Sequence, residues 1–274
     1  MIRVELVKML RRPRTWVTIA MLNALPTLVA VLLAITDIGP QPGQGPPFLS
    51  AVLTDGTLFP LAALGIVLPL FMPIAVAFVA GDAIAGEAQA GTLRYVLARP
   101  VRRTHLLVAK LVGVLAFVLL AVVVVAGVAY VVGRTLLGGG DARTLLSGVT
   151  GVSGASLTSA QIVQRTLMSI LYIALSMLGV AALALLLSTF TDSPLAAALG
   201  ALGFLIASTL LLTLDAASAL QPYLPTRYWL SFVDLFRSPI LWRDVVRGVL
   251  LQGVYVAVFL GAAWANFTTK DIKS

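Results

Sequence analysis

Six stretches of this sequence are long, apolar and almost uncharged, and they restrict the fold more than any other feature. They cover residues 15–35, 58–80, 106–132, 162–189, 195–214 and 249–267. A helix needs about 20 mostly apolar residues to cross the hydrocarbon core of a bilayer. Backbone groups cannot stay unpaired in lipid, and these runs are too long and continuous for barrel strands. The sequence therefore predicts an all-α integral membrane protein with six transmembrane helices in a single domain, residues 1–274.

The composition favours a membrane protein over a soluble one. Hydrophobic residues make up 59% of the chain and charged residues 11%, against about 45–50% and about 25% in soluble domains. The formal net charge is +8, but the basic residues flank the apolar runs, which indicates contacts with lipid headgroups and not with nucleic acid. The chain contains no cysteine, which excludes disulfides and thiolate metal sites.

The distribution of basic residues predicts the orientation. With the N-terminus in the cytoplasm, 12 of the 19 Lys and Arg residues fall in cytoplasmic segments, and the first outer loop, residues 36–57, has none. By the positive-inside rule, both termini and the segment 81–105 are then cytoplasmic. The abundance of Ala, Gly and Arg hints at a GC-rich bacterial genome, so we expect a multi-pass protein of a bacterial plasma membrane.

Residues 1–14 predict an amphipathic helix on the inner membrane surface. Ile2, Leu6, Met9 and Leu10 recur with helical spacing, and Pro13 ends the segment. The opposite side carries charged residues, which are Glu5, Lys8, Arg11 and Arg12. A basic flank that only anchors the topology is the alternative. A cleaved signal peptide fits less well, because the apolar run that follows is longer than a usual signal-peptide core and no clean cleavage site follows it.

The second predicted span contains two prolines with helical spacing, Pro69 and Pro73, which share one face. Each removes a backbone hydrogen bond and strains the preceding turn, so together they are candidates for a hinge or for the lining of a pathway. A bent helix packed against its neighbours explains them equally well. Asn23 is the main polar residue at depth in the first span and is a further pathway candidate.

The segment 215–247 predicts short extracellular helices before the sixth span. Its sequence "QPYLPTRYWLSFVDLFRSPILW" mixes aromatic residues with Arg and Asp, a combination typical of the membrane interface. The prolines and charges make a seventh crossing costly.

The segment from Gly81 to Lys110 is a polar island in an otherwise apolar half of the chain. Its residues Leu93, Val96 and Leu97 predict one apolar face of a short helix that Pro100 ends. Glu87 and Arg94 would share a face if that helix ran continuously through Gly91. An apolar stripe with exposed charges is the form of a docking element, and a charged hairpin that only anchors two spans is the alternative.

This island, together with the topology, resembles the membrane subunits of ABC-2-type exporters. In that family the first cytoplasmic loop holds an acid, a Glu, a Gly-Thr pair, a short apolar helix, a basic-Pro pair and an Arg before the third span. The matching residues here are Asp82, Glu87, Gly91, Thr92, the helix Leu93–Ala98 with Arg94, Val96 and Leu97, then Arg99, Pro100, Arg102, Arg103 and Lys110. The amphipathic N-terminal helix, the six spans and the short outer helices extend the resemblance over nearly the whole chain.

The resemblance implies a permease subunit that couples to separate ATPase subunits through the segment 81–105. Two permease copies, or one copy with a paralogous permease, would pair above two copies of the ATPase subunit, with membrane lipids as further partners and no nucleic acid. ATP and Mg would bind to the ATPase, and no cofactor or metal to this chain. The sequence agrees, because it has no G-x-x-x-x-G-K-[ST] phosphate loop and no catalytic or metal-ligating cluster.

Three other classes of function remain open at this point. A passive channel or an ion-coupled carrier would need titratable groups at mid-membrane, which the sequence lacks. A membrane enzyme would need a catalytic cluster, and the chain has one His and no Cys. A scaffold without transport activity is the last. For an exporter, the mostly apolar spans suggest an amphipathic or hydrophobic substrate.

The orientation leads to a labelling prediction, since single cysteines can be introduced without background. Cysteine at Gln89 or Ser274 should react with an impermeant reagent only from the cytoplasmic side, and cysteine at Gly43 or Ser153 only from outside. Labelling of position 89 from outside in intact cells would reverse the predicted orientation.

Overall fold

The computed structural model describes residues 1–36, 56–92, 103–137, 149–150 and 156–269. The fold is all-α, apart from a pair of two-residue antiparallel strands, β1 and β2. The elements in order are α1 (Ile2–Arg11), α2 (Pro13–Thr36), η1 (Gly56–Leu58), α4 (Phe59–Val67), α5 (Phe71–Gln89), α7 (Arg103–Leu136), β1 (Val149–Thr150), β2 (Ser156–Leu157), α9 (Ser159–Phe190), α10 (Pro194–Leu212), η2 (Asp215–Ala217), η3 (Gln221–Tyr223), η4 (Trp229–Phe236) and α11 (Trp242–Thr269).

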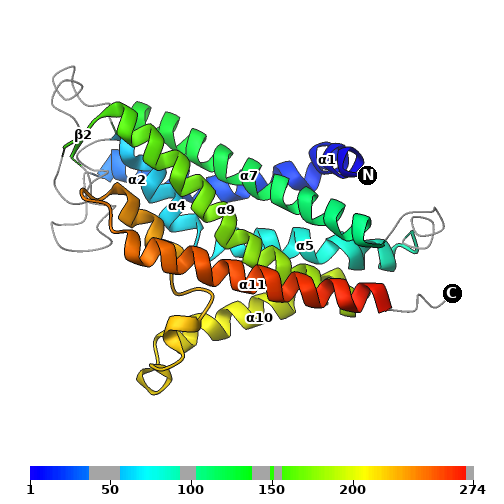
Figure 1. The fold of residues 1–274 in the computed structure, drawn as a ribbon. Helices are drawn as coiled ribbons and strands as arrows, with labels where there is room; N and C mark the ends of the chain where they lie inside the picture. Colours follow the sequence, from blue (N-terminus) through cyan, green and yellow to red (C-terminus); the bar gives the residue numbers. More distant parts are fainter. Residues whose placement is uncertain (37–55, 93–102, 138–148, 151–155, 270–274) are drawn as a thin grey trace.

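Six of the described helices are long and apolar enough to cross a membrane, namely α2, α5, α7, α9, α10 and α11. This confirms the predicted all-α fold with six potential membrane spans. Figure 1 shows α1 and the last turn of α11 at the same end of the bundle, which we call the terminal end. The last turn of α5 and the first turn of α7 lie at that end too. In the same view α1 is seen end-on while α7 and α11 run across the picture, so α1 lies transverse to the long helices.

Local sequence explains where several helices begin. Pro13 and Pro194 each occupy the first position of a helix, where the backbone N–H has no helical partner and its loss costs nothing. At α9, Thr158 and Gln161 form a capping box, with Gln161 Oε1 accepting from Thr158 N at 3.0 Å. At α10, Ser193 Oγ accepts from Ala196 N at 3.3 Å.

The second predicted span differs from the structure, because it is two helices. α4 and α5 are separated at residues 68–70, where Pro69 has no N–H to continue the ladder of α4. Pro73 lies in the first turn of α5, where helical N–H groups are unpaired in any case. The predicted span ended at residue 80, whereas α5 continues to Gln89, because its late polar residues find partners within the protein.

Gly91 ends this region and corrects one expectation about the polar island. Its φ is +66°, the left-handed conformation that glycine adopts most readily. Thr92 follows, and both its N–H and its Oγ1 donate to the carbonyl oxygen of Glu87, at 2.9 and 3.2 Å. α5 therefore ends before Gly91, so the predicted continuous helix through Gly91 is not present.

The core lies where α4, α5, α7 and α9 meet. α4 is buried along almost its whole length, against α7 and α2. α9 packs against α5, α7, α10 and α11. Many core positions are alanines, which let helices approach closely, and large side chains such as Phe59, Phe117 and Met177 fill the space between them.

The segment between α10 and α11 folds into three short 3-10 helices, η2, η3 and η4, and carries no additional potential span. η4 packs against α9 and α11 with Trp229, Phe232 and Leu235 buried. Side chains of α9 and α11 also bind the backbone that precedes η4. Tyr172 Oη donates to Tyr228 O at 2.6 Å, and Gln252 Nε2 donates to Pro225 O at 2.7 Å.

Two glycines of α7 test the packing of α4 against α7. A Cβ added to Gly133 would collide with the backbone of Gly56 and with Phe59, whereas one added to Gly127 would meet nothing within 4 Å. We expect Gly133→Ala to lower the unfolding free energy by about 1–3 kcal/mol, the usual cost of overpacking. Gly127→Ala should be neutral or stabilising by up to about 1 kcal/mol. Thermal unfolding in detergent measures both, and equal stability of the two variants would contradict the close approach.

Candidate functional site

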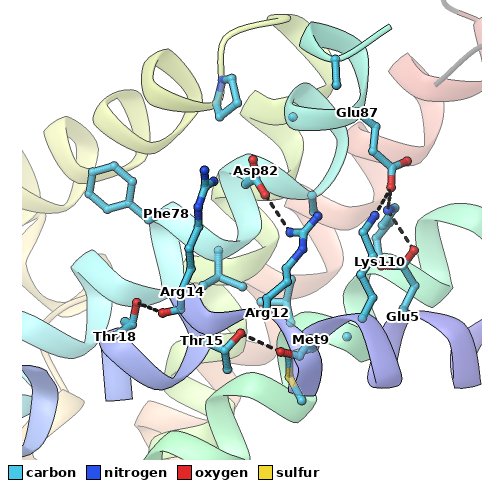
Figure 2. A pocket seen from close by; sticks show the side chains of 18 of the residues that line it. Glu5, Met9, Arg12, Arg14, Thr15, Thr18, Phe78, Asp82, Glu87 and Lys110 are labelled. Atoms are coloured by element: carbon cyan, nitrogen blue, oxygen red, sulfur yellow. Dashed lines mark hydrogen bonds and ion pairs between the residues drawn. The ribbon is translucent and has the colours of Figure 1, made fainter. Parts of the chain in front are cut away.

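Four charged side chains from three helices meet at the terminal end of the bundle. Glu5 and Lys8 come from α1, Glu87 from α5 and Lys110 from α7 (Figure 2). We call these four residues the charge cluster. Lys110 Nζ donates to Glu5 Oε1 at 3.0 Å and also to Glu87 Oε1, and Lys8 Nζ donates to the same Glu87 oxygen at 2.6 Å. Two positive and two negative charges therefore balance within one group.

Burial makes this balance energetically important. The side chain of Lys110 is 3% exposed and that of Glu87 is 10% exposed. A buried charge without a partner costs several kcal/mol, whereas a paired one can be close to neutral. Lys110 is therefore accommodated among apolar helices because Glu5 and Glu87 are present, and each of the three helices depends on the other two at this point.

A second ion pair connects the same elements nearer to the surface. Arg12, in the link between α1 and α2, donates to Asp82 Oδ2 at 3.0 Å. The two side chains are 46% and 30% exposed, so the pair contributes less than the charge cluster. It fixes the bend between α1 and α2 against α5, together with Thr15 Oγ1, which donates to Met9 O at 2.8 Å.

Helix α1 presents its charged side to the bundle. Glu5 and Lys8 face α5 and α7, whereas Ile2, Val4 and Leu10 are between 44% and 66% exposed. The two faces differ in part from those predicted from the sequence, because Met9 packs against the core and Arg11 is exposed. The exposed apolar side chains are left for another apolar surface to cover.

Ser188 of α9 anchors α5 just before the charge cluster. Its hydroxyl donates to Gly81 O at 2.7 Å and accepts from Ala85 N at 2.8 Å, inside the backbone ladder of α5. Gly81 itself packs closely on α10, where an added Cβ would lie 3.1 Å from the backbone of Ala198. The polar half of α5 is thus held by α9 and α10 on one side and by α1 and α7 on the other.

The structure places part of the predicted coupling set and corrects the expected environment of one member. The sequence predicts an exposed charge at position 87, but Glu87 is buried, because Lys110 and Lys8 draw it into the protein. Arg103, the first residue of α7, donates to the carbonyl oxygens of Phe267 and Thr268 at the end of α11, both at 3.1 Å. The predicted residues Leu93, Arg94, Val96, Leu97, Arg99, Pro100 and Arg102 lie outside the described residues.

The predicted pathway or hinge residues are dispersed. Pro69 lies at the break between α4 and α5, and Pro73 is buried in the first turn of α5. Asn23 Nδ2 donates to Ile19 O of its own helix at 2.7 Å, so its amide is used locally. In the described part of the chain, no group of three or more His, Cys, Asp or Glu side chains is arranged to hold a metal ion.

A cavity of about 1170 Å³ opens beside the charge cluster. Its walls come from α1, the start of α2, the second half of α5, the start of α7 and the start of α10. Glu5, Lys8, Arg12, Asp82, Glu87 and Lys110 all line it, and so does Arg14. The ion pairs of this region therefore surround a space and are not packed into solid protein.

Sequence reasoning identified half of this site. Asp82, Glu87 and Lys110 stood out as polar residues between apolar spans. The sequence assigned their partners Glu5, Lys8 and Arg12 to the polar face of a helix on the membrane surface. Helical periodicity separates a polar from an apolar face, but it does not say which face contacts the rest of the protein. Ser188 gave no signal, since a single serine in an apolar span is common.

Comparison with known proteins places most of the chain in one family. Residues 46–273 match the family described as "Protein of unknown function (DUF2705)". The matched range includes Asp82, Glu87 and Lys110, and Glu5, Lys8 and Arg12 precede it. No curated protein matches the chain.

Removal of Lys110 tests the charge cluster. Lys110→Met leaves Glu5 and Glu87 with only Lys8, so we expect a loss of about 3–5 kcal/mol in unfolding free energy. Lys110→Met combined with Glu87→Leu leaves Glu5 and Lys8 balanced and should recover part of that loss. Arg247→Ala is the control, since its pair with Asp244 is half-exposed at 3.9 Å and contributes about 0–1 kcal/mol. A double variant less stable than Lys110→Met would refute a charge-balanced cluster.

Proposed function

This chain belongs to the DUF2705 family, and we propose that it is the transmembrane permease subunit of an ATP-binding cassette exporter. In this proposal it forms the substrate pathway with a second permease and couples to separate ATPase subunits through the segment 81–105. The resemblance of Gly81–Lys110 to the coupling loop of ABC-2-type exporters motivates the proposal.

The observation that carries the proposal is the ion pair between α5 and α7, the two helices that this segment connects. Glu87 lies in the helical first part of the segment 81–105 and Lys110 lies just after its end, and the two side chains bond to each other and to α1. A partner that pushes on the segment would therefore move α5, α7 and α1 together. An anchoring hairpin would not need two helices and a surface helix to share buried charges.

The proposed cycle assigns the energy source to the partner. Two ATPase subunits, with ATP and Mg, dock beneath two permease copies or beneath this chain and a paralogous permease. Closure of the ATPase dimer displaces the coupling segments, and the charge cluster passes this displacement to the helices. The break at Pro69 is the candidate hinge, because α4 and α5 are not joined by a continuous hydrogen-bond ladder there.

The arrangement of the helices also supports the proposed placement in a bacterial plasma membrane with both termini in the cytoplasm. The transverse α1 exposes apolar side chains that the inner lipid leaflet would cover. The 3-10 helices between α10 and α11 would lie at the outer surface. There the exposed aromatic residues Tyr223 and Trp242, on either side of η4, would face the interface.

An ion-coupled carrier or a passive channel is less well supported by the charges. Among the described residues, the buried charged side chains are Glu87, Lys110 and Arg165. The first two lie at the terminal end, and Arg165 lies near the start of α9, where it donates to Arg237 O at 3.0 Å. None is placed midway along a span, where a proton or ion relay needs titratable groups.

Co-expression with the cognate ATPase tests the proposal. The complex should contain two ATPase subunits and two permeases, and this chain purified alone should neither bind nor hydrolyse ATP. Leu97→Asp should reduce recovery of the ATPase more than Arg102→Ala does, because apolar anchors in a docking groove contribute more than charges at its rim. Normal assembly and ATP-driven export by Leu97→Asp would show that the segment is a topological anchor.

A further inference from the structure

The cavity beside the charge cluster has a cation without a partner. Lys8, Lys110 and Arg12 are all held by carboxylates. Arg14, which is exposed, also lines the cavity and takes part in none of the ion pairs between described residues. Figure 2 shows the Arg14 side chain extending between Phe78 and Asp82. A guanidinium in this position can bind an anion with two parallel hydrogen bonds, which phosphate accepts well.

The same cavity is also lined by a carboxylate that the protein leaves partly exposed. The side chain of Asp82 is 30% exposed, and its Oδ2 accepts from Arg12 at 3.0 Å. An ionised carboxylate has two oxygens and accepts several hydrogen bonds. Asp82 can therefore accept a group that carries further N–H or O–H donors.

Part of the remaining wall consists of apolar side chains that are exposed on the surface of the bundle. Val17, Phe78 and Leu195 line the cavity, and they are 57%, 43% and 55% exposed. They belong to α2, α5 and α10, three helices long and apolar enough to cross a membrane. An apolar chain lying on these side chains would continue along the helices into the hydrocarbon core.

We propose that this cavity binds the headgroup of a phospholipid that carries an ammonium group, such as phosphatidylethanolamine. The phosphate binds Arg14, the ammonium faces the carboxylate of Asp82, and an acyl chain lies over Phe78 and Leu195. One ligand then offers an anion to Arg14, N–H donors to Asp82 and an apolar chain to the exposed apolar side chains. The site is independent of any ATPase, so it can be tested whether or not the chain is an exporter subunit.

Two lipids that differ only in the three N-methyl groups of the headgroup give the sharpest test. Dioleoyl phosphatidylethanolamine and dioleoyl phosphatidylcholine share their phosphate, net charge and acyl chains, but the trimethylammonium of the second has no N–H. The full chain, delipidated in detergent, is titrated with each lipid, and bound lipid is counted by native mass spectrometry. We expect phosphatidylethanolamine to bind about tenfold more tightly, the effect of one charge-assisted hydrogen bond.

Variants of two neighbouring arginines locate the site. Arg14→Ala should weaken both lipids about tenfold, and Arg14→Lys should keep part of the binding, because a charge remains. Arg11→Ala is the matched control, since Arg11 is exposed and does not line the cavity. Unfolding temperatures without lipid confirm that the variants are folded.

Three results would overturn the proposal. Equal effects of Arg14→Ala and Arg11→Ala would place the lipid elsewhere. Equal binding of the two lipids by the wild-type chain would show that the ammonium makes no hydrogen bond to Asp82. Dioleoyl phosphatidylglycerol binding more tightly than phosphatidylethanolamine would make the cavity a site for anionic lipid.

Discussion

The charge of Lys110 sets a condition that the rest of the terminal end has to meet. An ammonium group with 3% of its side chain exposed needs carboxylates within hydrogen-bond distance. α5 supplies Glu87, and α1 supplies Glu5. Glu87 can reach Lys110 because α5 remains helical past residue 80. Glu5 can reach it because α1, which ends before Pro13, lies transverse to the long helices at the terminal end. The length of one helix and the direction of another are thus tied to a single buried cation.

The apolar parts of the fold could be read from the sequence with good accuracy. Long hydrophobic runs have few ways to satisfy their backbone in lipid, so six helices followed from length alone. The break at residues 68–70 was harder to predict, because Pro69 and Pro73 indicate strain in a helix and not whether it bends or separates. Pro26, inside the continuous helix α2, shows that proline alone does not decide the matter.

The charged parts of the fold were predictable as residues and not as contacts. Glu87 stood out, but its burial depends on Lys8 and Lys110, which are 79 and 23 positions away. Local patterns carry no information on such pairings, whereas they do carry capping signals such as Thr158 with Gln161. Arg103 illustrates the same limit: a basic residue at the start of a span fits the positive-inside rule, and only the fold reveals that it caps the end of α11.

The charge cluster also affects the order in which the helices associate during synthesis of the protein. Glu5 leaves the ribosome 105 residues ahead of Lys110, a delay of roughly 5–20 s at ordinary rates of synthesis. Until α7 is made, Glu5 lacks Lys110, its partner in the cluster, and α1 can pair with α5 only through Lys8 and Arg12. The synthesis of Lys110 then joins α1, α5 and α7. The first helix to be synthesised is therefore among the last to be locked in place.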